Sequence, residues 1–195
     1  MSDLFYLQDS RGLTGENMMF WAFGGGYTSD IRQAEVFSKE AAVRQHQSRE
    51  SDIPWPAEYI KGRFYTPVDM QHLRHADGNS RDVAFYEQVP GRWIGNDCLW
   101  VYGSTETTDL RLASVFASLQ PGCVMWPVEE IQKLARPAVR ASDVSIKEAL
   151  DGSGIVINKP KRTKREVFNC HQCGRFISED QRFFDCPNCG AENRP

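Results

Sequence analysis

The sequence predicts an α+β fold in which two tandem duplicated ββαα units pack as one body and a small cysteine-rich tail follows. The main observation is a repeated stretch, since residues 28–37 recur at 107–116 with six of ten positions identical. Ordinary residue usage would give about 0.6 matches in such a window. Apolar residues make up 41% of the chain, which is a globular composition. Four of the six cysteines fall in the last 26 residues, which sets the tail apart.

The repetition extends beyond the ten-residue stretch. Residues 5–8 match 85–88, residues 55–60 match 126–131, and Gly15 matches Gly95. Aligned in this way, Trp21 lies opposite Trp100 and Trp55 opposite Trp126, all four as core residues. We therefore expect a first unit at 1–75, a second at 82–158, a linker at 159–166 and a tail at 167–195. Units this small should pack on each other through their aromatic faces, and neither should fold well alone.

Local signals place the elements of each unit. Strands are expected at 4–8 and 18–23, a tight turn at Gly24–Gly26, a short helix capped within Thr28–Asp30, and a helix that begins at Pro56. Residues 38–50 predict an additional helix that the second unit lacks. Because it has few apolar positions, we expect it to lie on the surface. A helix with a capping box at Ser145 ends near Gly152, and 155–157 is expected to form a last strand.

Charge is divided unevenly along the chain. The net charge is −3, while residues 159–195 hold eight Lys/Arg and five Asp/Glu, or +3, which leaves −6 for residues 1–158. Any polyanion contact is therefore expected in the tail. The sequence shows no leader and no apolar run near 18 residues, so a soluble cytoplasmic protein is expected, in the host cytoplasm if phage-encoded.

The motif with the most specific spacing is Cys170-x2-Cys173 with Cys186-x2-Cys189. Each pair puts two sulfurs on one tight turn, and the twelve residues between the pairs allow a hairpin to bring the turns together. Four thiolates fill the tetrahedral shell of one structural Zn²⁺ and leave no position for water. Two disulfides are the alternative. His171 is not expected to be a ligand, because four cysteines complete the site.

The stretches Cys170-His-Gln-Cys173-Gly174 and Cys186-Pro-Asn-Cys189-Gly190 resemble four-cysteine zinc ribbons over residues 167–195. The resemblance implies a zinc-nucleated hairpin that touches nucleic acid or protein. Candidate contacts are cationic: Lys159, Lys161, Arg162, Lys164, Arg165 and Arg175. A solubilising tether is the alternative role for the linker. The phenylalanines of the tail can stack on bases, although at least two are expected in its small core.

Neither cofactor-binding nor catalytic residues are predicted. Asp30 with Arg32 and Asp109 with Arg111 occur in both copies, but no repeated His, Cys or Ser accompanies them as base or nucleophile. Helix capping and an ion pair account for them. A second metal site at His72, His75, Asp69 and Asp77 is less plausible than a polar connection between the units. Cys98 and Cys123 are expected as small core residues, and Gly24–Gly26 as a turn without a phosphate-loop lysine.

The body, through Gly26-Tyr27-Thr28-Ser29-Asp30 and Ile53-Pro54-Trp55-Pro56, resembles short uncharacterised phage and prophage proteins. The resemblance implies an accessory role exercised by binding. The expected function is a non-enzymatic zinc-binding protein that contacts nucleic acid or a nucleic-acid-handling complex. One alternative is a protein-only inhibitor of a host enzyme or defence complex, and another is a nucleotide-processing enzyme with a site between the units. Deletion of 39–50 is expected to leave the fold intact and impair partner binding.

Overall fold

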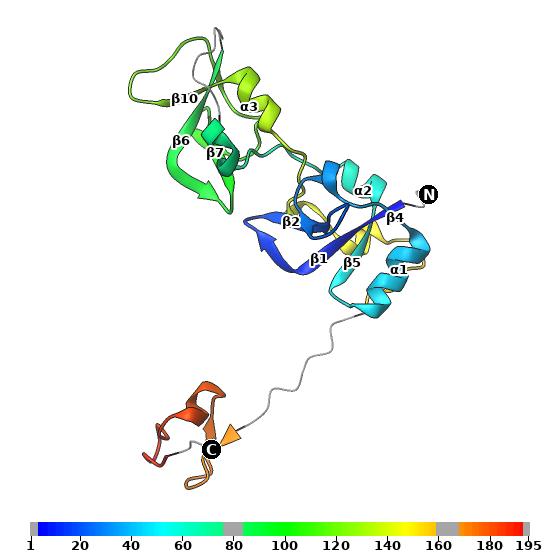
Figure 1. Cartoon of the computed structure of the whole chain (residues 1–195), viewed down its shortest axis with the longest axis vertical. Coiled ribbons are helices and arrows are strands. Elements are labelled where there is room, and N and C mark those ends of the chain that lie inside the picture. The colour runs from blue at the N-terminus through cyan, green and yellow to red at the C-terminus, as the bar shows by residue number, and fades with distance from the viewer. Residues whose placement is uncertain (1–3, 76–83, 159–167, 193–195) are drawn as a thin grey trace. The chain divides into compact units, whose positions relative to one another are not determined.

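The computed structural model describes residues 4–75, 84–158 and 168–192. The chain divides into two compact units, a body at Met1–Lys159 and a tail at Pro160–Pro195. The body is a mixed α/β structure with two curled antiparallel sheets and few helices (Figure 1). Within the described residues, no helix has the length and apolar character needed to cross a membrane.

The first sheet has five strands around a long central one. β1 (Leu4–Thr14) pairs with β2 on one side and with β4 and β5 on the other, and β2 also pairs with β3. The remaining bounds are β2 (Asn17–Trp21), β3 (Tyr27–Thr28), β4 (Phe37–Ser38) and β5 (Asp52–Pro56). The helices of this half are the 3-10 helix η1 (Ile31–Gln33), α1 (Lys39–Ser48) and α2 (Ala57–Lys61).

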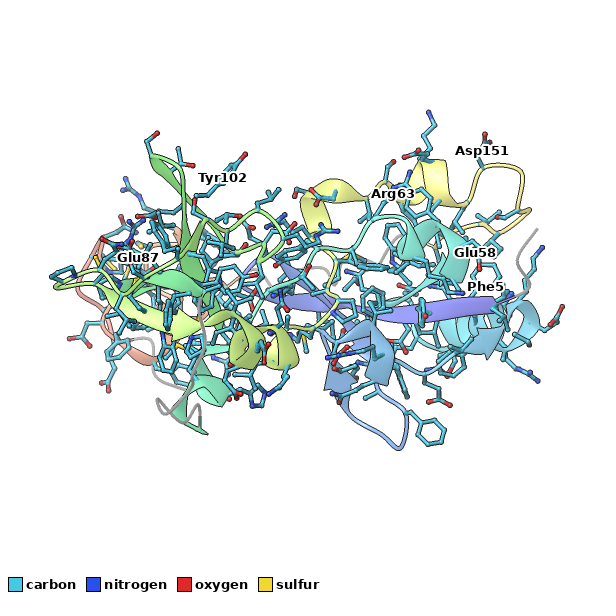
Figure 2. All side chains as sticks on the ribbon, turned by 90° about the horizontal axis from the view of Figure 1, so that it is seen from above. Phe5, Glu58, Arg63, Glu87, Tyr102 and Asp151 are labelled. Atoms are coloured by element: carbon cyan, nitrogen blue, oxygen red, sulfur yellow. The ribbon has the colours of Figure 1, made fainter. Side chains whose placement is uncertain are left out.

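The second sheet has the same pairing scheme around β6 (Phe85–Ile94). Its other strands are β7 (Asp97–Tyr102), β8 (Thr105–Thr107), β9 (Val115–Phe116) and β10 (Val124–Pro127), followed by α3 (Val128–Leu134). The 3-10 helix η2 (Met70–His75) lies between the halves in sequence, and η3 (Ala141–Asp143) and α4 (Ile146–Ala149) follow the second half. No helix corresponding to α1 lies between β9 and β10. Figure 2 shows Tyr102 and Glu87 in this half and Phe5, Glu58 and Arg63 in the other.

The simple ββαα order is wrong in three places. The helix expected after Asp30 is only the 3-10 turn η1. The Trp-Pro stretch begins as strand β5, because Trp55 pairs with Tyr6, and the helix starts one residue after Pro56. Proline is tolerated at such a strand end, where its missing N–H costs no ladder bond. Residues 155–157 form no strand, and Ile155 and Ile157 pack against the core instead.

The strand registers correct the expected alignment of the tryptophans. Gln8 pairs with Phe20 in the first sheet, and Gln88 pairs with Trp100 in the second. Phe20 therefore occupies the place of Trp100, and Trp21 does not. Phe20 pairs with Thr28 and Trp100 with Thr107, separations of eight and seven residues. The one-residue difference thus falls in the turn after these strands, where Gly24, Gly25 and Gly26 all have positive φ.

The two halves exchange core residues. The core of the first half includes Tyr6, Phe20 and Trp55 together with Val139, which follows α3 in the chain. Reciprocally, the core of the second half includes Val68, which follows α2. Matching hydrogen bonds fix the exchange, since Met18 N–H donates to Val139 O and Cys98 N–H to Val68 O, each at 2.9 Å. The expected contact through aromatic faces is wrong, because each aromatic cluster lies inside its own half.

Helix α1 is part of the core of the first half, which corrects the expectation of a surface helix. Ser38 caps it, as its side chain accepts from Ala41 N–H. Ala42 and His46 are 0% and 1% exposed, and Ala42 packs with Phe5 and Leu7 of β1. His46 Nδ1 donates to Asp52 O (2.9 Å), and its Nε2 accepts from Asn158 N–H (3.0 Å). Apolar content alone concealed this burial, since a small residue and an imidazole make the contact.

Candidate metal centre

The tail brings its four cysteines together on two turns of matching geometry. In the first, Cys170 N–H donates to Arg175 O (2.9 Å) and Gly174 N–H to Cys170 O (2.9 Å). In the second, Cys186 N–H donates to Ala191 O (2.7 Å) and Gly190 N–H to Cys186 O (2.8 Å). Gly174 and Gly190 have φ of 68° and 72°, a backbone conformation that glycine adopts without steric cost. The sequence Cys-x-x-Cys-Gly thus specifies each turn.

The sulfurs stand at distances suited to sharing one metal ion. All four Sγ atoms lie within 4.8 Å of one another. Cys170 and Cys189 Sγ are 3.7 Å apart, as are Cys173 and Cys186 Sγ. A disulfide would need about 2.05 Å. Tetrahedral thiolates at about 2.3 Å from a metal would stand about 3.8 Å apart. The cysteines are free in the structure, and together they can hold a metal ion.

The charges within the cluster also favour a cation. Although burial opposes its ionisation, N–H groups of Asn188 and Cys189 lower the pKa of Cys186 to about 6. The Ala191 N–H favours the Cys189 thiolate, but burial and the other sulfurs raise the pKa of Cys189 to about 12. Interacting thiols ionise as a set, so the first proton leaves easily and the last is held by repulsion between thiolates. A bound cation removes that repulsion.

The hydrophobic core of the tail is smaller than expected. Ile177 is 2% exposed and packs with Cys170 and Cys186, and Phe168 is partly buried against them. Phe176 and Phe184 are each 64% exposed and Phe183 is 48% exposed. The expectation that at least two phenylalanines are buried is therefore wrong, because the cysteines themselves occupy the centre of the module.

The candidate polyanion contacts are only partly described. Lys159, Lys161, Arg162, Lys164 and Arg165 lie outside the described residues. Arg175 is exposed, and its Nη1 donates to Asn188 Oδ1 (3.4 Å). Arg182, which the sequence did not single out, lies over the rings of Phe168 and Phe183 at 4.8 and 4.6 Å.

Comparison with known proteins adds no assignment to this geometry. No protein-family model, no curated protein and no solved structure matches the chain.

The repeated Asp-Arg pairs serve the backbone. Asp30 caps η1 by accepting from Arg32 N–H, and the Arg32 guanidinium also binds its carboxylate. Asp109 accepts from Arg111 in the same way and from Thr66 N–H and Oγ1 as well. Burial opposes the charge of each aspartate, but the arginine bonds keep both pKa values below the ordinary one. The predicted capping role is confirmed for Asp30.

A buried polar cluster between the halves was missed. Asp97 Oδ2 accepts from Asn17 Nδ2 (2.6 Å), and Asp97 Oδ1 accepts from Arg136 Nη2 (2.6 Å). The Tyr65 hydroxyl donates to Asn17 Oδ1 (2.6 Å). Asn17 and Asp97 hold the same place in their hairpins, since they pair with Thr14 and Ile94. The signal in the sequence was a polar residue two positions after Gly15 and Gly95.

The other candidate residues have structural surroundings. Cys98 is buried, as predicted, and burial raises its thiol pKa to about 12. Cys123 is exposed, so its assignment to the core is wrong; it lies on the connection that replaces α1. Among the described residues, the only cluster of metal-binding groups is that of the four cysteines. His72 belongs to no such cluster, and the side chain of His75 and Asp77 lie outside the described residues.

Proposed function

We propose that the protein is a non-enzymatic binding protein whose C-terminal zinc ribbon contacts nucleic acid or a nucleic-acid-handling complex. The observation that carries the proposal is a small module built around four thiols while its aromatic side chains stay exposed. Exposed aromatic residues at this density, three in a described stretch of 25 residues, are typical of binding surfaces.

Zinc is the proposed metal. Four thiolates at tetrahedral separations form its usual structural shell, and that shell leaves no open position for substrate or water. The ion would stabilise the fold of the tail, since so few apolar residues are buried there. Elemental analysis of the full-length protein should find one zinc per chain. A protein whose tail cysteines are oxidised to disulfides would contradict this assignment.

We further propose that the body arose by tandem duplication, as expected for a phage-type accessory protein. The proposal is supported by corresponding contacts in the two sheets. Trp55 Nε1 donates to Gln8 Oε1 (2.8 Å), and Trp126 Nε1 donates to Gln88 Oε1 (2.7 Å). The capping pairs and the exchanged valines correspond in the same way.

Salt dependence tests the nucleic-acid contact. The protein should bind bare DNA or RNA with an affinity that falls steeply as salt rises. Changing Lys161, Arg162, Lys164 and Arg165 together to Ser should lower the log–log slope by about 3 to 4, because each cation releases a counterion. An unchanged slope would place the polyanion contact elsewhere. Absence of binding to bare nucleic acid would favour the protein-only inhibitor, in which the acidic body mimics nucleic acid.

A further inference from the structure

The two cysteine turns of the tail share a backbone but differ in the side chains on their outer face. At a spacing of 16 residues, Cys170 corresponds to Cys186 and Gly174 to Gly190. Asn169 pairs with Phe176 at the base of the first turn, and Asp185 pairs with Glu192 at the base of the second. The first base is therefore neutral and aromatic where the second is acidic. Only the first suits a polyanion.

Strand alternation directs Phe176 away from the core. Its neighbour Ile177 is 2% exposed and packs against the cysteines, whereas Phe176 is 64% exposed. Arg175, next to it, is exposed as well. A rigid aromatic ring beside a cation, held on a metal-stapled turn, offers a flat face on which an unpaired base can stack.

The described tail has nothing suited to reading a duplex. Its strands β11 (Phe168–Asn169) and β12 (Phe176–Ile177) have two residues each, and its one helix is the 3-10 helix η4 (Asp180–Phe183). Base edges in the major groove are read by an α-helix or a longer two-stranded ribbon. Stacking instead needs bases that are already unpaired.

We propose that the tail takes single-stranded nucleic acid, with a base stacked on Phe176 of the first cysteine turn. This inference rests on the proposed contact with nucleic acid and narrows it to one structural class. Because every base has a π-face, binding should tolerate many sequences. Phe184, equally exposed, is the candidate for a second base.

The test compares a labelled single strand of about 12 nucleotides with a duplex of the same sequence, by fluorescence anisotropy on the zinc-loaded full-length protein. The single strand should bind more tightly. Phe176→Ala should weaken its binding about 5- to 150-fold, the range that loss of one stacked base gives. The salt slope should stay unchanged, since no counterion is involved. Phe23→Ala is the matched control, because it removes an 84% exposed phenylalanine from the body.

Unchanged zinc content of Phe176→Ala would show that the variant retains its fold. Equal binding of duplex and single strand, or wild-type affinity of Phe176→Ala, would overturn the inference and leave the proposed nucleic-acid contact standing. Failure to bind either strand form would overturn both, and would direct the search toward a protein partner.

Discussion

The junction between the two halves offers a sharp test, because two glycines meet there backbone to backbone. A Cβ added at Gly95 would lie 2.6 Å from Gly15 Cα and in contact with Gly15 N. A Cβ at Gly15 would lie 2.8 Å from Gly95 N. Real Cβ atoms do not approach backbone this closely, so alanine at either position must push the halves apart. Gly95→Ala is the variant of choice.

A matched control separates this clash from backbone strain. Gly95 and Gly103 have φ of 60° and 57°, and each is the first residue of a two-residue turn between neighbouring strands. No atom lies within 4 Å of a Cβ added at Gly103. Gly103→Ala therefore bears only the left-handed backbone penalty, about 1–2 kcal/mol. Gly95→Ala bears the same penalty plus overpacking of about 1–3 kcal/mol.

Urea and thermal unfolding of the full-length protein, followed by tryptophan fluorescence, would measure the difference. Gly95→Ala should lower the free energy of unfolding by about 2–5 kcal/mol and Gly103→Ala by about 1–2 kcal/mol. For a body of this size, each kcal/mol lowers Tm by about 2–4 °C. Equal losses for the two variants would refute the close contact of the halves at Gly15 and Gly95.

Three further predictions concern the tail, helix α1 and acid stability. Cys186→Ser, or chelation, should unfold the tail and leave the Tm of the body unchanged, as circular dichroism before and after metal removal would show. Deleting 39–50 should now destabilise the body, on the order of 3–6 kcal/mol, because it uncovers Phe5 and Leu7; an unchanged urea midpoint would show that α1 is dispensable. The pKa of Asp109 is lowered in the folded state, so its contribution is present above about pH 4 and is lost as pH falls through the folded pKa. Asp109→Asn should therefore flatten the fall of Tm below about pH 4, and a fall as steep as that of the wild type would show that Asp109 contributes little.

Helix α1 and the cysteine turns illustrate where sequence reasoning succeeds. The start of α1 was predictable, because a serine cap acts on an N–H only three residues away. The cysteine turns were predictable for the same reason, since each hydrogen bond closes within a few residues. Burial of α1 was not predictable, because Ala42 and His46 contact strand residues more than 30 positions earlier.

The tail shows a different limit. Spacing identified all four candidate ligands, but it could not decide which phenylalanines fill the core. In a module of this size, the sulfurs take the interior that aromatic rings would fill elsewhere. Exposure of Phe176 and Phe184 therefore follows from tertiary packing around the cluster.

By itself, the sequence determined the repeated Thr-x-Asp-x-Arg signal, the capping role of Asp30 and the set of four cysteines. Each of these depends on contacts within a few residues along the chain. Only the tertiary structure decided that Phe20 takes the place of Trp100 and that Val68 and Val139 complete each other's half. It also decided that Asn17 meets Asp97. These pairings join residues about 30 to 120 positions apart, and a register shift of one residue turns a side chain to the opposite face of its sheet.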